Sequence, residues 1–353
     1  MDENKNIGKW LKATVISAAV LLIACIALVV AIDPFFQYHK PLSGFPYVVD
    51  NQLSANAGMA KNFDYDSILT GSSMVSNFDL DSFESKLSSK CIKVNYNGAY
   101  PKDISNILEY VFSNHENLKT VYFGMDIYSY NSSTEDVKYP FPEYLYDNNY
   151  INDISYVFNK DVLFEYIIAP LRFPAKRTEL SKVYMMEYEE SQYSKESVIG
   201  HYETPVEGSL SESEYDERII SFKENLFKNL VPFIESHPET EFVIFYPPYS
   251  ILYWDTRKTE GWMDLLLEEY RIVADTLLEY GNVKIYNFSD AWEYTENLDN
   301  YVDYMHQHAR VNEYILDCIA SDKCRVTREN VSDITNSMRE HVDGYDFSAL
   351  LGE

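Results

Sequence analysis

Residues 67–74 read SILTGSSM, a run of apolar and β-branched residues that leads into a Gly-Ser-Ser turn. The run predicts a short buried strand, and the turn places two hydroxyl groups where that strand ends. In an open parallel sheet, ligands bind beyond the carboxyl ends of the strands. Ser73 is therefore our candidate nucleophile, and Ser72 is either a rival for that role or a nearby hydrogen-bond donor.

Runs of β-forming residues and amphipathic segments alternate along much of the chain. Further strands are expected at 92–96, 120–124, 241–246 and 283–288, and helices at 79–89, 101–114, 216–236 and 262–280. This alternation predicts an α/β fold in which helices cover both faces of a parallel sheet. We expect this domain to comprise residues 64–126 and 216–324, followed by a polar C-terminal helix and tail at 325–353.

Residues 127–215 interrupt the alternation and greatly exceed the length of a normal connection between a strand and a helix, about two to six residues. They contain 13 of the 31 tyrosines. Tyrosine offers an apolar ring together with a hydroxyl, which suits ligands such as sugars. The stretch predicts an inserted, aromatic-rich cap over the active face.

A stretch of 20 residues without a charge, 13–32, is long enough to cross a membrane as one helix. Lys5, Lys9 and Lys12 precede it, so the positive-inside rule puts residues 1–12 in the cytoplasm and the rest of the chain outside. We expect a single-pass cell-membrane protein with an extracellular domain, joined to the anchor by a linker at 33–63.

Two alternatives to a retained anchor stay open. Residues 29–31, Val-Val-Ala, would serve as the cleavage site of a signal peptide, although the apolar core would be unusually long. Residues 22–25, Leu-Ile-Ala-Cys, resemble a lipoprotein box, but the apolar run continues past Cys25.

Charge and cysteine content narrow the functional classes. The chain has 56 acidic and 29 basic residues, a formal net charge of -27, which disfavours nucleic acid as a partner. Cys318 and Cys324 are close enough in sequence to form a small disulfide loop, whereas Cys91 is expected to be a buried free thiol. No cysteine or histidine cluster indicates a metal, so no cofactor is expected.

A second set of polar residues follows the later strands. Asp303 and His306 form an Asp-x-x-His pair after the last strand of the alternation. A serine hydroxyl becomes a good nucleophile when an imidazole takes its proton, and a carboxylate three residues away can hold that imidazole in one tautomer. Ser73, His306 and Asp303 are therefore the expected catalytic triad, with His308 as a rival base.

This order of motifs resembles the SGNH/GDSL hydrolase superfamily, and especially its membrane-anchored DltD-like branch. In that family a first-strand Gly-Asp-Ser or Gly-x-Ser motif supplies the nucleophile and a late Asp-x-x-His supplies the acid and base. The resemblance covers roughly residues 64–126 and 216–320. It implies a three-layer α/β/α, flavodoxin-like domain and an esterase or acyltransferase.

The resemblance also implies an oxyanion hole, and here the sequence departs from the family. Gly98 matches the expected second-block glycine, but Asp126 stands where an asparagine amide is expected. An ionised carboxylate would repel a developing oxyanion. Either Asn97 supplies the amide, or Asp126 faces an attacking hydroxyl or the cap, or the activity is weak. Tyr246 and Tyr249 lie at the end of the fourth strand and are expected either to bind a sugar ring or to pack.

Three functions are compatible with these observations. The first is an esterase or O-acyltransferase acting on acylated surface glycans such as teichoic acid, exopolysaccharide or peptidoglycan. The second is a catalytically weak accessory protein of a membrane-bound O-acyltransferase. The third, least favoured, is a metal-dependent phosphohydrolase that uses Asp126, Asp303, His306 and His308.

Overall fold

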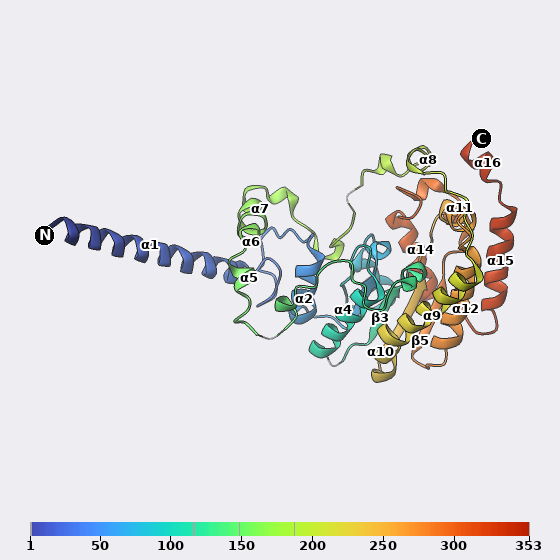
Figure 1. Ribbon diagram of the computed structural model, residues 1–353, viewed down its shortest axis with the longest axis horizontal. Coiled ribbons are helices and arrows are strands. Elements are labelled where there is room, and N and C mark those ends of the chain that lie inside the picture. Colours follow the sequence, from blue (N-terminus) through green and yellow to red (C-terminus); the bar gives the residue numbers. More distant parts are fainter. Residues whose placement is uncertain (1, 116, 148, 187, 353) are drawn as a thin grey trace. The chain divides into compact units, whose positions relative to one another are not determined.

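The predicted β-rich runs pair as neighbours in one sheet of the computed structural model, which describes residues 2–115, 117–147, 149–186 and 188–352 (Figure 1). The strand order is β2-β1-β3-β4-β5-β6, and the first five strands are parallel. The strands are β1 (Ser67–Gly71), β2 (Cys91–Lys93), β3 (Thr120–Gly124), β4 (Glu241–Tyr246), β5 (Val283–Asn287) and β6 (Arg325–Val326). The expected α/β class with a mostly parallel sheet is confirmed.

The strand order places a switch point between β1 and β3. From β1 the chain moves to β2 on one side, and then returns across β1 to β3 on the other side. Loops that leave the carboxyl ends of β1 and β3 diverge there and open a crevice, which is where doubly wound sheets bind ligands. Gly71 pairs with Gly124 in the register, so both strands end level with each other at this point.

The helices form two packed groups. In the first, α3 (Leu80–Leu87) packs on α14 (Ala309–Ala320). In the second, α4 (Pro101–Asn114), α9 (Glu212–Asn229), α12 (Met263–Leu277) and α15 (Val331–Gly344) pack in sequence, and α10 (Val231–Ser236) contacts α9. Shorter helices of this part are α8 (Lys195–His201), α11 (Ile251–Thr259), α13 (Trp292–Thr295) and α16 (Phe347–Leu351).

Two details of this domain differ from expectation. The helix expected at 216–236 is broken at Leu230, because Pro232 in the first turn of α10 cannot donate the backbone hydrogen bond that a continuous helix requires. Strand β6 was not expected, and it pairs antiparallel to β5 at the edge of the sheet. With only two residues, Arg325 and Val326, it has no alternation of its own.

The chain divides into two compact units, which differ from the expected domains. One unit comprises Met1–Phe63 and Pro142–Leu180, and the other comprises Asp64–Phe141 and Ser181–Glu353. Residues 127–215 are therefore not a single inserted cap, and residues 33–63 are not a simple linker. Sequence pattern could not show this, because the contacts that join 33–63 to 142–180 are long-range: Leu53 and Tyr146 are 93 positions apart, and Val49 and Thr178 are 129 apart.

The first unit is built around the end of α1 (Asp2–Ile32) and α2 (Gln52–Asn62). The buried carboxylate of Asp33 accepts hydrogen bonds from the backbone N–H groups of Gln37 and Tyr38 and from the Tyr156 hydroxyl. The second segment of the unit is a series of short helical pieces: α5 (Ile154–Val157), α6 (Lys160–Leu163), a π-helical turn (Phe164–Ile168) and α7 (Ala169–Arg172). Within α1, Asn6–Ile32 is long and apolar enough to cross a membrane, and almost none of it is buried.

Candidate active site

The turn that follows β1 positions Ser73. Ser72 caps a short 3-10 helix, η1 (Ser73–Val75), whose turn brings the Val75 side chain against Gly124. A Cβ atom on Gly124 would lie 2.4 Å from Val75 Cγ1, and one on Gly71 would lie 2.6 Å from the Gly124 carbonyl oxygen. Gly71 also has a φ of 146°, which side chains disfavour. Glycine at both positions allows the turn to sit directly over the ends of β1 and β3.

Ser73, His306 and Asp303 form a continuous chain of hydrogen bonds. Ser73 Oγ lies 2.8 Å from His306 Nε2, and His306 Nδ1 lies 2.7 Å from Asp303 Oδ2. Both distances are within the range needed for proton transfer and for fixing the imidazole tautomer. All three side chains are half-buried, so a substrate can still reach them. The structure therefore brings together the three residues that the sequence suggested.

The carboxylate of Asp303 is held on both of its oxygens. Oδ1 accepts the backbone N–H groups of Met305 and His306, each at 2.7 Å, while Oδ2 faces the imidazole. Burial opposes ionisation, but these hydrogen bonds and the neighbouring imidazole outweigh it and keep the pKa of Asp303 below its usual value. Asp303 is thus an ionised acceptor that holds the proton of His306 on Nδ1.

A polar network behind the turn fixes the position of Ser73. The Asn95 amide donates to the Ser72 carbonyl and to Ser76 Oγ, at 3.1 and 2.9 Å. The Gln307 amide donates to the Met74 carbonyl at 3.0 Å. The segment after β2 and the histidine loop therefore both hold the turn that carries Ser73. Asn95 and Gln307 were not expected as positioning residues, although they lie within two residues of Asn97 and His306, which were selected.

Lys93 adds a buried cation to this framework. Its Nζ donates to the carbonyl oxygens of Ser76, Phe78 and Val183, at 2.6, 2.7 and 2.9 Å. Burial lowers the pKa of Lys93 to about 7. The three acceptors use every N–H of the ammonium form, and they tie the segment after η1 to the segment that begins at 181. No local pattern in the sequence marks this lysine, which lies within a short strand.

The residues expected to form an oxyanion hole lie on two strand ends, and none is a clear match. Gly98 is exposed, has a φ of 68°, and lies next to the Lys138 side chain. The side-chain oxygen of Asn97 accepts a hydrogen bond from Ser76 Oγ at 2.9 Å, so only its NH₂ group can serve a substrate. The expectation that Gly98 and Asn97 act as donors stays a prediction.

Asp126 lies close enough to His306 to interact with it electrostatically. Burial raises the pKa of Asp126, and the Tyr249 hydroxyl, Arg257 and His306 offset that effect only in part. A carboxylate at this position would favour a protonated imidazole and would oppose an oxyanion. An interaction with His306, which was not among the expected roles, therefore fits Asp126 better than a role in the oxyanion hole.

The substitution Asp126→Asn is expected to raise the melting temperature at neutral pH by about 2 °C. Because the pKa of Asp126 is higher in the folded chain than in the unfolded one, ionisation costs stability above that pKa, and the cost disappears as the pH falls towards 3.8. Thermal unfolding of both chains at pH 7.5 and 4.5 tests this. The exposed Glu217, changed to Gln, is the control. A gain that is equal at both pH values, or a loss of stability, would contradict the assignment.

The two rival catalytic residues have other partners. His308 Nε2 lies 2.9 Å from Glu190 Oε2, its Nδ1 accepts the Arg310 N–H at the start of α14, and its ring packs edge-on against Tyr193. Ser72 Oγ accepts the Met74 N–H at 3.3 Å. Both side chains therefore have structural roles next to the triad, and neither forms the hydrogen bonds of a nucleophile or a base.

Tyr246 and Tyr249 do not form a sugar-binding surface, so that interpretation is wrong for this conformation. Both side chains are buried: the Tyr246 ring packs on Tyr270 with centroids 4.2 Å apart, and the Tyr249 ring stacks on Tyr253 at 4.1 Å. A ring enclosed by other aromatic rings has no face left for a sugar. The alternative expectation, that the two tyrosines pack, is the correct one.

Two tyrosines of residues 181–215 lie near the triad. Tyr188 and Tyr193 are close enough to Asp303 for its charge to contribute to the raised pKa of each hydroxyl, after burial as the main cause. Their rings meet edge-on at 6.1 Å, and both retain some exposure. This segment, rather than the whole of 127–215, supplies aromatic side chains to the surroundings of the site.

Arg257 on α11 is a further residue near the site that was not expected from the sequence. Its guanidinium lies over the rings of Tyr128 and Tyr253, 4.7 and 5.1 Å from their centroids, and pairs with Glu260 at 3.2 Å. Its positive charge is one of the causes that lower the pKa of the Asp126 carboxyl. An amphipathic helix contains arginine commonly, so no sequence signal distinguished this residue.

Two further expectations concern the cysteines and a metal site. Cys318 and Cys324 are free thiols with Sγ atoms 3.7 Å apart, and Cys91 is a half-buried thiol. Within the described parts of the chain, no group of three or more His, Cys, Asp or Glu residues is arranged to hold a metal ion. The residues of the phosphohydrolase hypothesis instead have the separate partners given above.

The fold and site define a class by geometry: an α/β domain whose first strand ends in a serine hydrogen-bonded to a His-Asp pair. Acyl transfer through a serine is the chemistry that such an arrangement can perform. The sequence matches no protein-family model, and a search of the curated proteins found no match.

Proposed function

We propose that this chain is a membrane-anchored serine esterase or O-acyltransferase of the SGNH type that acts on acylated cell-surface glycans. The observation that carries the proposal is the hydrogen-bonded chain from Ser73 Oγ through His306 to Asp303. Ser73 and His306 are 233 residues apart, and they meet at the switch point of the sheet. A contact of this kind needs a specific fold to bring the two residues together.

The proposed reaction follows from the positions of these atoms. Ser73 Oγ attacks the ester carbonyl while His306 Nε2 takes the hydroxyl proton. His306 then gives this proton to the leaving alcohol, and an acyl-serine remains. In the second half, His306 takes a proton from water or from a sugar hydroxyl, whose oxygen attacks the acyl-serine. The bond from the acyl carbon to Ser73 Oγ then breaks, and His306 gives the proton back to Ser73 Oγ. The ionised Asp303 stabilises the imidazolium formed in both halves.

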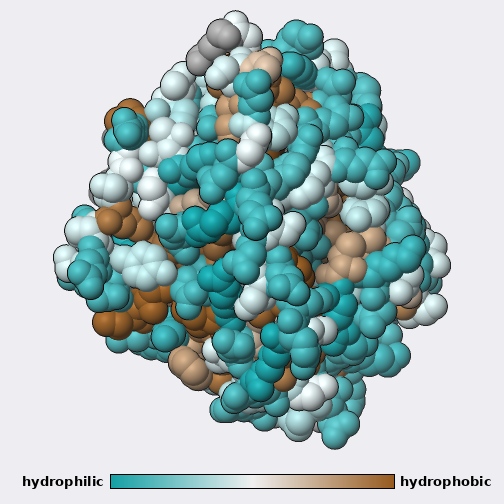
Figure 2. All heavy atoms as spheres, turned by 90° about the vertical axis from the view of Figure 1, so that its right-hand side faces the viewer, coloured by the Kyte–Doolittle hydropathy of each residue, from teal (hydrophilic) through white to brown (hydrophobic). Residues whose placement is uncertain are grey.

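The proposed location rests on α1. The apolar segment Asn6–Ile32 has the length and composition of a single membrane span, and the lysines before residue 13 favour a cytoplasmic N-terminus. A domain held at the outer surface would meet polymers such as teichoic acid, exopolysaccharide or peptidoglycan. The side of the molecule that lies to the right in Figure 1 is mostly hydrophilic, with hydrophobic residues in separate areas (Figure 2), as suits an aqueous surface.

A second function is favoured by Asp126. A carboxylate in place of the amide donor would weaken oxyanion stabilisation, by an amount on the order of 10²- to 10³-fold for one lost donor. In that case the chain would serve as an accessory protein of a membrane-bound O-acyltransferase and would hold the acyl group or the polymer with little turnover.

Covalent labelling of the full chain in detergent with a fluorophosphonate probe tests the proposal. An activated serine displaces fluoride and keeps the phosphonyl group, whereas an ordinary serine does not react. We expect labelling within minutes, with the modified peptide containing Ser73, and no labelling of the variant His306→Ala. Absence of any labelled peptide would reject the esterase and leave the accessory function.

A further inference from the structure

We propose that the segment 150–173 of the first unit is inserted into the bilayer beside α1, so that this unit is seated in the lipid as well as tethered to it. The inference rests on the proposed anchoring through α1. It adds a second membrane contact, formed by residues far from α1 in sequence.

The first unit begins where the span ends. Val29 and Asp33 are buried, the Tyr47 hydroxyl donates to the Ile32 carbonyl at 2.8 Å, and the Tyr156 hydroxyl donates to Asp33 Oδ1. The last turn of α1 is thus part of the folded unit, with no linker between them. If α1 crosses the membrane up to Ile32, the surface of this unit nearest to α1 must lie at the lipid headgroups.

The helical pieces α5 and α6 contact α1 directly. Helix α5 exposes Ile154, 59% exposed, and the C-cap Phe158, and Ile151 in the turn just before it is 88% exposed. Ile154 and Phe158 lie on one helical face because they are four residues apart. That face is apolar and has no cover among the described residues of the unit.

The π-helical turn Phe164–Ile168 and α7, which follow α6, repeat this pattern. Phe164, Ile168 and Leu171 are exposed at spacings of four and three, whereas Val162 and Ile167 are buried within the unit. A helix of a soluble protein buries one apolar stripe and presents polar residues on the opposite face. These pieces therefore expose apolar side chains as well as burying them, with the exposed charges of Asp161 and Glu165 beside them. Apolar and charged side chains together on an exposed face are typical of a segment that lies at a membrane surface.

The charges near this surface fit a lipid better than a protein partner. In a chain with a net charge of -27, residues 166–178 contain Arg172, Lys176 and Arg177 and no acidic residue, and the nearest carboxylates are those of Asp161, Glu165 and Glu179 on either side of this stretch. Basic side chains next to apolar ones are the composition of membrane-surface segments, because they meet lipid phosphates at the headgroup level.

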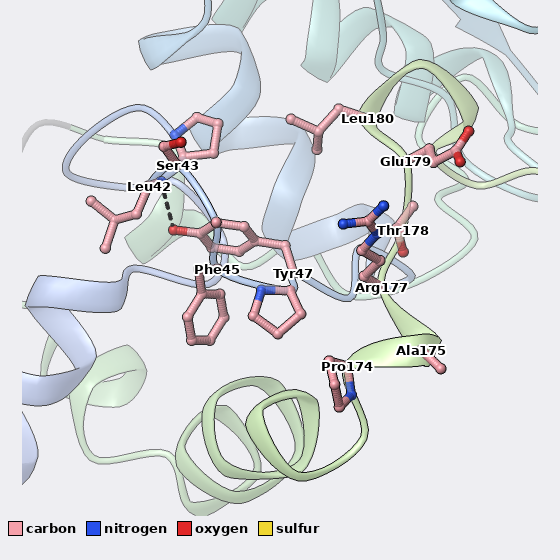
Figure 3. Close-up of a pocket in the computed structure, with 13 residues that line it drawn as sticks. Leu42, Ser43, Phe45, Tyr47, Pro174, Ala175, Arg177, Thr178, Glu179 and Leu180 are labelled. Atoms are coloured by element: carbon pink, nitrogen blue, oxygen red, sulfur yellow. Dashed lines mark hydrogen bonds between the residues drawn. The ribbon is translucent and has the colours of Figure 1, made fainter.

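A pocket at the same end of α1 also favours lipid as the partner of this surface. Residues 41–47 and 174–180 enclose about 770 Å³, and Figure 3 shows the Phe45 and Tyr47 rings and the Arg177 guanidinium around it. Tyr47 forms one wall and also bonds the end of α1. Arg177 and Glu179 both line the pocket, so its formal charge is balanced, and its apolar part, which includes the Phe45 and Tyr47 rings, would accept the acyl chain of a lipid.

Spin labelling of the full chain in vesicles of phosphatidylcholine and phosphatidylglycerol tests the proposal. The four native cysteines are replaced by Ala, and single cysteines replace Phe164, Phe173, Val20 or Phe227. Phe227 on α9 is the matched control, since it and Phe173 are both 53% exposed. Val20 reports on α1. We expect the labels at 164, 173 and 20 to be relaxed more by oxygen, which concentrates in lipid, and the label at 227 more by a water-soluble nickel complex.

Each other outcome would overturn the inference in a distinguishable way. If labels at 164 and 173 respond to nickel while label 20 responds to oxygen, the anchor stands and the segment lies in water. If neither reagent reaches 164 and 173, another protein or a second copy covers this face. If label 20 itself responds to nickel, the membrane anchor fails together with the inference, although the triad would still be labelled by the fluorophosphonate.

Discussion

The variant Ser73→Ala is expected to lose hydrolysis of a short p-nitrophenyl ester by roughly 10⁴-fold or more. Ser73 Oγ is the only atom of η1 that is hydrogen-bonded to His306 among the described residues, so no other group in that turn can form the acyl intermediate. The loss should appear in kcat, because binding of the ester does not depend on the nucleophile. Initial rates with purified full chain, over a range of ester concentrations, measure it.

Ser72→Ala is the matched control for this loss. Its hydroxyl accepts a backbone N–H at 3.3 Å and caps the same turn, so its removal should cost about 1 kcal/mol of stability and less than tenfold in rate. If Ser72→Ala abolishes hydrolysis while Ser73→Ala retains it, the nucleophile is misassigned by one residue. If both variants keep full activity, the proposed triad is wrong.

The sequence predicted the sheet well where its strands are buried on both faces. The bounds expected for β3 and β4 agree with the structure, since continuous apolar runs such as Glu241–Tyr246 end at clear boundaries. The same property made the side chains at the strand ends hard to interpret. A strand covered on both faces has no polar alternation, so nothing indicated that the Tyr246 ring points into the core.

The triad could be predicted because strand ends converge at one edge of a parallel sheet, whatever the intervening sequence. The residues that hold the triad in position could not be predicted in this way. The Gln307 amide and the Lys93 ammonium act through backbone carbonyls that are brought near by the tertiary fold. The division into two units was missed for the same reason, because the Asp33 to Tyr156 contact has no local signal.

The variant Asp303→Asn is expected to lower kcat by about 10⁴-fold and to change KM little. Oδ1 must remain an acceptor, because it faces the backbone N–H groups of Met305 and His306. An asparagine therefore has to place its NH₂ group against His306 Nδ1. That contact forces the imidazole proton onto Nε2, and a protonated Nε2 cannot take the proton of Ser73.

A double variant separates this positioning role from a merely structural one. In the Ser73→Ala background the tautomer of His306 has no reaction to serve, so adding Asp303→Asn should reduce the residual rate by less than threefold.

The melting temperature of Asp303→Asn adds a second readout. The lowered pKa of Asp303 means that its carboxylate stabilises the fold above about pH 3.8, and this contribution is lost as the pH falls through the folded value. The stability difference between Asp303→Asn and the parent chain should therefore be largest near neutral pH and shrink in acid. Equal losses of rate in both backgrounds would show that Asp303 supports the fold and does not orient the base.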